Sequence, residues 1–237
     1  MPEAVQTLHD FRFPGESEEY RRARDELLHA EVELRRQIER VAVQRRHLPP
    51  GGAVPTDYEF DEWDAAAGGP KRVRLSELFN GKHTLFLYSF MIVPAEQGLP
   101  FVGPCPSCTS IIDGIDGALP HITQRIAFAA AAGAPIEEFR RHGENRGWRH
   151  VRQLSAVPSN YSHDYGAADA NGYQWPIANV FVQRDGAVHH FWSSELWWVG
   201  HDEGQGPRHV DFMWPTWMVF DRTDEGRGTW EPRLEYE

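Results

Sequence analysis

Residues 84–110 of the chain read TLFLYSFMIVPAEQGLPFVGPCPSCTS. The stretch begins with an almost continuous apolar and β-prone run from Thr84 to Met91, which is typical of a central strand covered on both faces. A loop rich in proline and glycine follows, and then come both cysteines of the chain, Cys105 and Cys108. This stretch therefore bears both on the fold class and on the chemistry of the Cys-x-x-Cys pair.

The segments after the cysteines alternate between helix and strand. Residues 109–122 predict an imperfect helix with two glycines, and the alanine-rich residues 125–133 predict a buried strand. Residues 134–145 predict an amphipathic helix, with Pro135 at its start and Gly147 after its end. A short strand is expected within residues 150–155, before a loop or short helix.

The clearest local signal is a β-hairpin at residues 177–194, in which two β-prone runs flank Asp185–Gly186. On the other side of the central run, Val73 and Leu75 predict a short strand, and residues 76–79 predict a single helical turn. This alternation predicts an α/β fold, with a mixed central sheet and helices on both faces.

The N-terminal part predicts one long charged helix from about Glu16 to Arg46, which PPGG at residues 49–52 ends. Such a polar helix is either an arm laid over the domain or a dimer element. The expected organisation is a helical arm at residues 1–53, one domain at residues 54–222 and a tail at residues 223–237. The apolar surface that the arm and tail offer suggests a homodimer.

Composition excludes some classes of partner. The chain has 237 residues, enough for one substantial domain, and a formal net charge of -11. That charge argues against non-specific binding of nucleic acid or of anionic membranes. The first residues show no basic region followed by an apolar run, and no apolar stretch reaches the ~20 residues of a membrane helix. The expected location is the cytoplasm, where cysteine pairs are usually catalytic or sensing.

Several stretches together resemble the bacterial DUF899 family of thioredoxin-like proteins. They are LRRQIERVAVQRRHLPPG, LSELFNGKHTLFLYSFM, CPSC, DGIDGALPHI, GWRHVRQLS with SNYSHDYG, and FVQRDGAVHHFWSS. The resemblance covers most of residues 20–225. It implies a thioredoxin-like fold and a redox setting, without a substrate. It also implies a cis-proline that faces the dithiol before the hairpin, for which Pro176 is the nearest candidate. Pro104 stands where thioredoxin has a tryptophan.

The chemistry expected of the pair is thiol–disulfide exchange. A cysteine at a helix N-terminus gains from the dipole and the free N–H groups, so Cys105 is the expected nucleophile. Cys108, one turn later, is the expected resolving thiol. The substrate would be a protein or small-molecule disulfide or thiol, and no cofactor or metal is expected. A peroxidase is a variant of this interpretation, with Gly103–Pro104 before the nucleophile.

Two other interpretations stay open. The cysteines could bind copper or zinc, which needs further ligands from the histidines. The candidates are His121, His189, His190, His201 and His209. Alternatively, the protein is a non-catalytic scaffold. The tryptophans that would then bind a partner or a ligand, or simply pack in the core, are Trp192, Trp197, Trp198, Trp214 and Trp217. Similarly, Tyr161, His163, Asp164 and Tyr165 shape either a pocket or a solvated loop.

Overall fold

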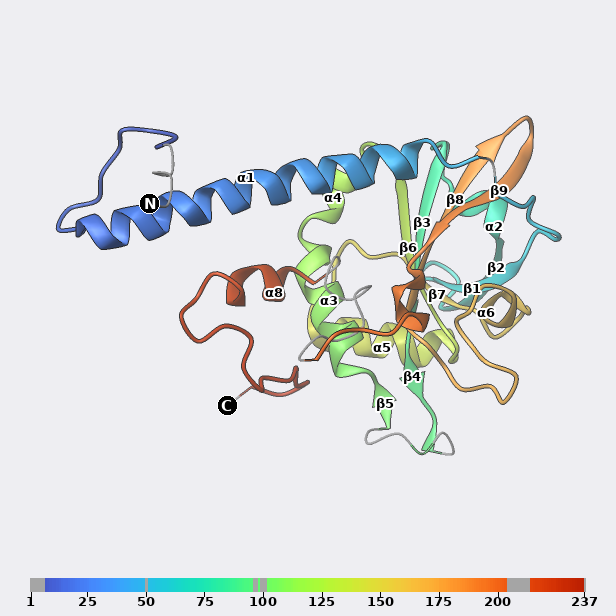
Figure 1. Ribbon diagram of the computed structural model, residues 1–237. Coiled ribbons are helices and arrows are strands. Elements are labelled where there is room, and N and C mark those ends of the chain that lie inside the picture. Colours follow the sequence, from blue (N-terminus) through green and yellow to red (C-terminus); the bar gives the residue numbers. More distant parts are fainter. Residues whose placement is uncertain (1–6, 50, 96–97, 99–101, 204–213, 237) are drawn as a thin grey trace. The chain divides into compact units, whose positions relative to one another are not determined.

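The computed structural model describes residues 7–49, 51–95, 98, 102–203 and 214–236 (Figure 1). The chain divides into two compact units, residues 1–49 and residues 50–237. The boundaries expected at residues 53 and 222 stay predictions. No helix within the described ranges has both the length and the apolar composition that crossing a membrane requires.

The first unit is mainly one long helix, α1 (Glu18–Arg46), as the charged N-terminal sequence predicts. Ser17 caps it by accepting the N–H of Tyr20 at 3.1 Å. The first turn carries acidic side chains and the last turn carries basic ones, which suits the helix dipole. Ion pairs between exposed side chains, such as Glu39 with Arg46 at 2.9 Å, add modest local support.

The second unit is built on one seven-stranded sheet with the strand order β2-β1-β7-β6-β3-β8-β9. The strands are β1 (Glu59–Asp64), β2 (Gly69–Arg74), β3 (Thr84–Phe90), β6 (Ala127–Ala132), β7 (Gln153–Ser155), β8 (Ile177–Arg184) and β9 (Ala187–Ser193). Strands β3, β6 and β7 are mutually parallel, and the remaining pairings are antiparallel. The sheet is therefore mixed, as predicted.

Strand β3 is the central strand that its apolar run predicts. Its even-numbered side chains, Tyr88 and Phe90, belong to one buried core. Its odd-numbered side chains, Leu85 and Leu87, belong to a second core on the opposite face. This alternation follows from the two-residue period of a strand. The alanine-rich β6 is likewise buried along its whole length, between β3 and β7.

Helices cover both faces of the sheet. The helices of this unit are α2 (Leu75–Leu78), α3 (Pro106–Asp116), α4 (Leu119–Ile122), α5 (Ile136–Arg146), α6 (Tyr161–Asp164) and α8 (Pro215–Phe220), with a 3-10 helix at Glu195–Trp198. Ile111 of α3 and Phe139 of α5 pack in the first core. Leu78 of α2 and Tyr161 of α6 pack in the second. Segment 159–166 therefore contains a short helix, Tyr161–Asp164, which the buried Tyr161 anchors to the core.

The order and direction of the strands around β3 define the fold class. β3 and β6 are parallel and joined through α3 and α4, while the β8–β9 hairpin lies antiparallel on the other side of β3 (Figure 1). The hairpin turns at Asp185–Gly186, whose φ angles of 51° and 78° suit the Asp-Gly dipeptide. This arrangement is the thioredoxin-like fold that the sequence predicts.

β1 is an element that the sequence does not predict, whereas the short strand predicted at Val73 corresponds to β2. β1 reads EFDEWD, and its acidic residues are depleted in strands generally. Phe60 of β1 is fully buried in the second core, and Arg72 of β2 adds cross-strand ion pairs with Glu59 at 2.8 Å and Asp61 at 2.9 Å. The strand expected to include Leu75 ends at Arg74, since Leu75 begins α2.

Candidate functional site

A short ribbon of two strands returns the chain to the end of β3 after the proline-rich loop. β4 (Ile92–Val93) pairs antiparallel with β5 (Gly103–Pro104). The next residue, Cys105, donates its N–H to the carbonyl oxygen of Met91 at 3.0 Å. The long loop between them therefore does not carry the dithiol away from the sheet.

The dithiol occupies the first turn of α3. Cys105 is the N-cap residue in an extended conformation, and Pro106 follows at the first helical position, which requires no N–H donor. The Cys105 Sγ accepts the backbone N–H of Cys108 at 3.5 Å. A sulfur that takes the place of the usual capping oxygen lies where a negative charge is best stabilised.

Both cysteines are free thiols, and they differ in environment. Cys105 keeps 6% of its surface exposed, whereas Cys108 is fully buried. The hydrogen bond from the Cys108 thiol, together with backbone N–H groups of Cys108 and Ser107, lowers the pKa of Cys105 to about 7. Burial, followed by the neighbouring Cys105, raises the pKa of Cys108 well above its ordinary value. The geometry thus distinguishes Cys105, whose pKa is lowered and which keeps a small exposed surface, from Cys108, whose pKa is raised and which is fully buried.

A buried phenol lies against the hidden thiol. Tyr88, on the face of β3 that α3 covers, is fully buried and its hydroxyl donates to the Cys108 Sγ at 3.3 Å. The sequence shows Tyr88 only as a β-prone residue of the central run. No local pattern marks it as a partner of the dithiol.

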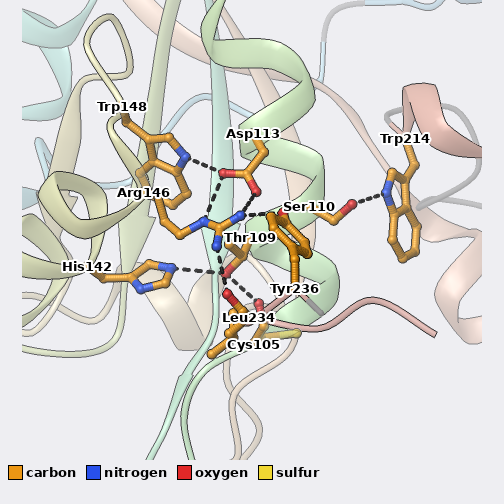
Figure 2. A network of polar contacts seen from close by, with 10 residues as sticks. All are labelled: Cys105, Thr109, Ser110, Asp113, His142, Arg146, Trp148, Trp214, Leu234 and Tyr236. Carbon is orange, nitrogen blue, oxygen red and sulfur yellow. Dashed lines mark hydrogen bonds and ion pairs between the residues drawn. The ribbon is translucent and has the colours of Figure 1, made fainter.

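A series of hydrogen bonds leads from the backbone of Cys105 to a buried histidine. The hydroxyl of Thr109 donates to the carbonyl oxygen of Cys105 at 2.9 Å and lies 3.0 Å from the Nε2 of His142 (Figure 2). Because the Thr109 proton is used, the imidazole must donate from Nε2. Burial, and next the charge of Arg146, lower the pKa of His142 to about 4, so its ring is neutral at neutral pH.

Figure 2 also shows how the C-terminal segment is held beside α3. Arg146 of α5 pairs with Asp113 of α3, and the same carboxylate accepts the indole N–H of Trp148 at 2.7 Å. The guanidinium donates further to the carbonyl oxygen of Leu234 at 2.8 Å and to the hydroxyl of Tyr236 at 2.6 Å. The end of the expected tail is therefore bound to Arg146 of α5, and the ion pair of Arg146 with Asp113 links it to the helix that carries the dithiol.

The structure corrects the expectation for Pro176. It lies directly before β8 and is buried, where the strand register continued by one residue would oppose Phe90. Its peptide bond is trans, as are all peptide bonds in the described parts of the chain. The trans form is the lower-energy state of an X-Pro bond. A role of Pro176 beside the dithiol stays a prediction.

The residue two positions before Pro176 makes a set of buried hydrogen bonds to the backbone. The buried amide of Gln174 accepts the N–H of Ile92 at 3.0 Å and donates to its carbonyl oxygen at 2.7 Å. The same amide lies 3.1 Å from the carbonyl oxygen of Gly133. Gln174 thereby ties β4, which precedes the cysteine loop, to the end of β6. No local sequence pattern marks Gln174 for this role.

The candidate histidines that the structure describes form no metal-binding group with the cysteines. Among the residues that the structure describes, no group of three or more His, Cys, Asp or Glu side chains could hold a metal ion. His189 contacts the carbonyl oxygen of Gly51, and His190 contacts Asn179. His121 is exposed on α4. His209 lies outside the described residues.

Comparisons with solved structures give low similarity. Peroxidoxin BcpB from Mycobacterium tuberculosis is 17% identical over 72% of this chain and 96% of its own, with a TM-score of 0.42. Mycobacterium bovis AhpC is 14% identical over 78% and 98%, with a TM-score of 0.41. A thiol:disulfide interchange protein of the thioredoxin family from Chlorobium tepidum TLS is 17% identical over 70% and 98%, with a TM-score of 0.35.

No curated protein matches the chain. A family match covers nearly all of it, because residues 12–236 match the family described as bacterial protein of unknown function (DUF899). The matched range includes α1, the sheet, the dithiol and the C-terminal segment that Arg146 holds. The chain belongs to the DUF899 family.

Proposed function

We propose that the protein is a thiol–disulfide oxidoreductase, in which Cys105 attacks a substrate disulfide and Cys108 resolves the mixed disulfide. The observation that carries the proposal is the asymmetry of the pair at the start of α3. Cys105 has a pKa of about 7 and some exposed surface, while Cys108 is buried one turn away. Only the thiolate is nucleophilic, so the two thiols suit two successive roles.

The step is balanced in atoms and electrons. The Cys105 thiolate attacks one sulfur of a substrate disulfide, and the other substrate sulfur leaves and takes a proton. The Cys108 sulfur, after losing its proton, then attacks the Cys105 sulfur; the Cys105–Cys108 bond forms, the bond to the substrate breaks, and the second substrate thiolate leaves and takes up a proton. The substrate gains two electrons and two protons, and the protein is left with a Cys105–Cys108 disulfide. A partner thiol must reduce this disulfide to complete a cycle, and the reverse direction oxidises a dithiol.

The substrate class is a protein or small-molecule disulfide, and the compartment that we propose is the cytoplasm, where thiols are kept reduced. A metal-binding alternative has the two thiolates but lacks further ligands among the described residues. The geometry favours thiol–disulfide exchange, because Cys105 is a free thiol and its sulfur accepts a backbone N–H at the start of α3.

The first test is the pH dependence of alkylation of Cys105. Because the reactive form is the thiolate and the pKa of Cys105 is lowered to about 7, the rate should rise with pH and level off above that value. An ordinary cysteine has its midpoint near about 8.5. Iodoacetamide labelling, followed by peptide mass spectrometry, gives the rate at Cys105 separately from Cys108. A midpoint at or above that of a free cysteine would contradict the assignment of Cys105 as nucleophile.

We also propose that the protein is a homodimer. Several large apolar side chains of α1 are exposed, among them Leu27, Leu34 and Ile38. In proteins, most of the stability of a helix comes from packing of its apolar side chains rather than from helix propensity. Sedimentation at micromolar concentration should give twice the chain mass of 27.1 kDa, and substitution of Leu34 by glutamate should shift the equilibrium toward monomer. A monomeric mass for the unsubstituted protein would contradict the homodimer proposal.

A further inference from the structure

The hydroxyl of Tyr88 is a polar group inside the otherwise largely apolar first core. The side chain is fully buried and belongs to the apolar core that also contains Phe90 and Ile112. Phenylalanine would fill nearly the same volume without bringing a polar atom out of water. The hydroxyl instead donates to the Cys108 Sγ at 3.3 Å. Packing alone therefore does not account for a tyrosine at this position.

We propose that Tyr88 is a catalytic residue of the resolving step, in which its hydroxyl stabilises the Cys108 thiolate that attacks the mixed disulfide. The inference rests on the proposed function and assigns a new role within the same site. In that step the Cys108 proton goes to solvent and the S–S bond to the substrate breaks. The substrate thiolate leaves with the electron pair and is protonated. Tyr88 keeps its own proton throughout.

The environment of Cys108 explains why such a donor matters. A thiolate in a fully buried site has lost its hydration, which makes it costly to form. The helix backbone stabilises Cys105 at the N-cap, whereas Cys108 lies inside the first turn. Burial and the neighbouring Cys105 raise the pKa of Cys108, and the Tyr88 hydroxyl acts in the opposite direction. A hydrogen bond to a charged group is roughly twice as strong as a neutral one.

Tyr88 acts as a donor and not as a base. Burial, and next the neighbouring Cys108, raise the pKa of Tyr88 well above its ordinary value. The phenol is therefore protonated at any pH at which the protein works. Its hydrogen bond is weak while Cys108 is a neutral thiol and strengthens as negative charge develops on the sulfur. That difference lowers the barrier of the resolving step, because stabilisation is gained mainly in the transition state.

The two chemical steps can be followed separately with one equivalent of a symmetric nitrobenzoate disulfide whose released thiolate is coloured. The first release reports the attack of Cys105, and the second reports resolution by Cys108. Tyr88→Phe should leave the first release within about twofold of the unsubstituted rate and slow the second by about ten- to a hundredfold, as expected for a lost hydrogen bond to a charged group. The pH midpoint of the second release should also rise.

The matched control is Tyr161→Phe, which removes another fully buried phenol from the second core, on the opposite face of the sheet. It should leave both releases unchanged. Equal rates of the second release in Tyr88→Phe and the unsubstituted protein would overturn the proposal. The absence of any first release from the unsubstituted protein would remove the proposed function, and the role of Tyr88 with it.

A second variant covers the case in which Tyr88→Phe does not fold. Fluorotyrosine at position 88 keeps the shape of the side chain and makes the hydroxyl a stronger donor. It should speed the second release and lower its pH midpoint, with the first release unchanged. An unchanged or slower second release in this variant would contradict the assignment.

Discussion

Cys105→Ser should abolish disulfide exchange, with a loss of about a thousandfold or more in the rate of reduction of a small disulfide. The reason is the identity of the nucleophile. A serine hydroxyl remains protonated at neutral pH, so the N–H groups at the start of α3 have no thiolate to stabilise. The measurement is turnover with dithiothreitol as the electron donor, corrected for the uncatalysed reaction.

Cys108→Ser is the matched control, because it changes the same atom one turn along the same helix. It should retain the first attack by Cys105 and stop at the mixed disulfide, which mass spectrometry detects as an adduct of one substrate thiol on Cys105. Comparable losses at the first attack in both variants, or full activity in Cys105→Ser, would contradict the division of roles between the two sulfurs.

Asp116→Ala should cost about 3 kcal/mol of unfolding free energy, since backbone donors are left without their acceptor. Asp116 is buried at the C-terminal end of α3, where the helix dipole disfavours a negative charge. Its carboxylate accepts the backbone N–H groups of Arg149, His150 and Val151 at 2.9–3.0 Å. These bonds fix the connection from α5 to β7 against the dithiol helix.

Urea unfolding followed by circular dichroism measures this loss. Asp116→Asn keeps one acceptor oxygen and should lose about half as much. Glu144→Ala removes an exposed carboxylate that pairs with Arg140 on the surface of α5, and should change stability by less than about 0.5 kcal/mol. Asp116→Ala as stable as Glu144→Ala would show that the three hydrogen bonds contribute little.

The elements that the sequence predicts correctly are those with strong local patterns. The continuous apolar run of β3, the alanine run of β6 and the Asp-Gly turn of the β8–β9 hairpin are each visible within a few consecutive residues. β1 is missed because its acidic residues favour no strand by themselves. Its place depends on Arg72 and on pairing with β2 and β7, which are formed only in the folded sheet.

The same distinction applies to the site. The Cys-x-x-Cys pair is local in sequence, so its position at a helix start could be predicted. The partners could not, because Tyr88 is 20 residues from Cys108 and Gln174 is 82 residues from Ile92. The trans bond before Pro176 depends on the backbone around it and not on the dipeptide. Fold topology brings these groups together, and only the structure identifies them.

The central claim is that Cys105 and Cys108 form a working redox pair, and the most direct measurement is their redox equilibrium. Metal-free protein would be held in a series of glutathione buffers, and free thiols would be counted by the mass shift on alkylation. The account predicts one cooperative two-electron transition, at a potential between roughly -270 and -120 mV. Thiols that never pair at any buffer ratio, or that react with the alkylating agent only after a chelator is added, would contradict it.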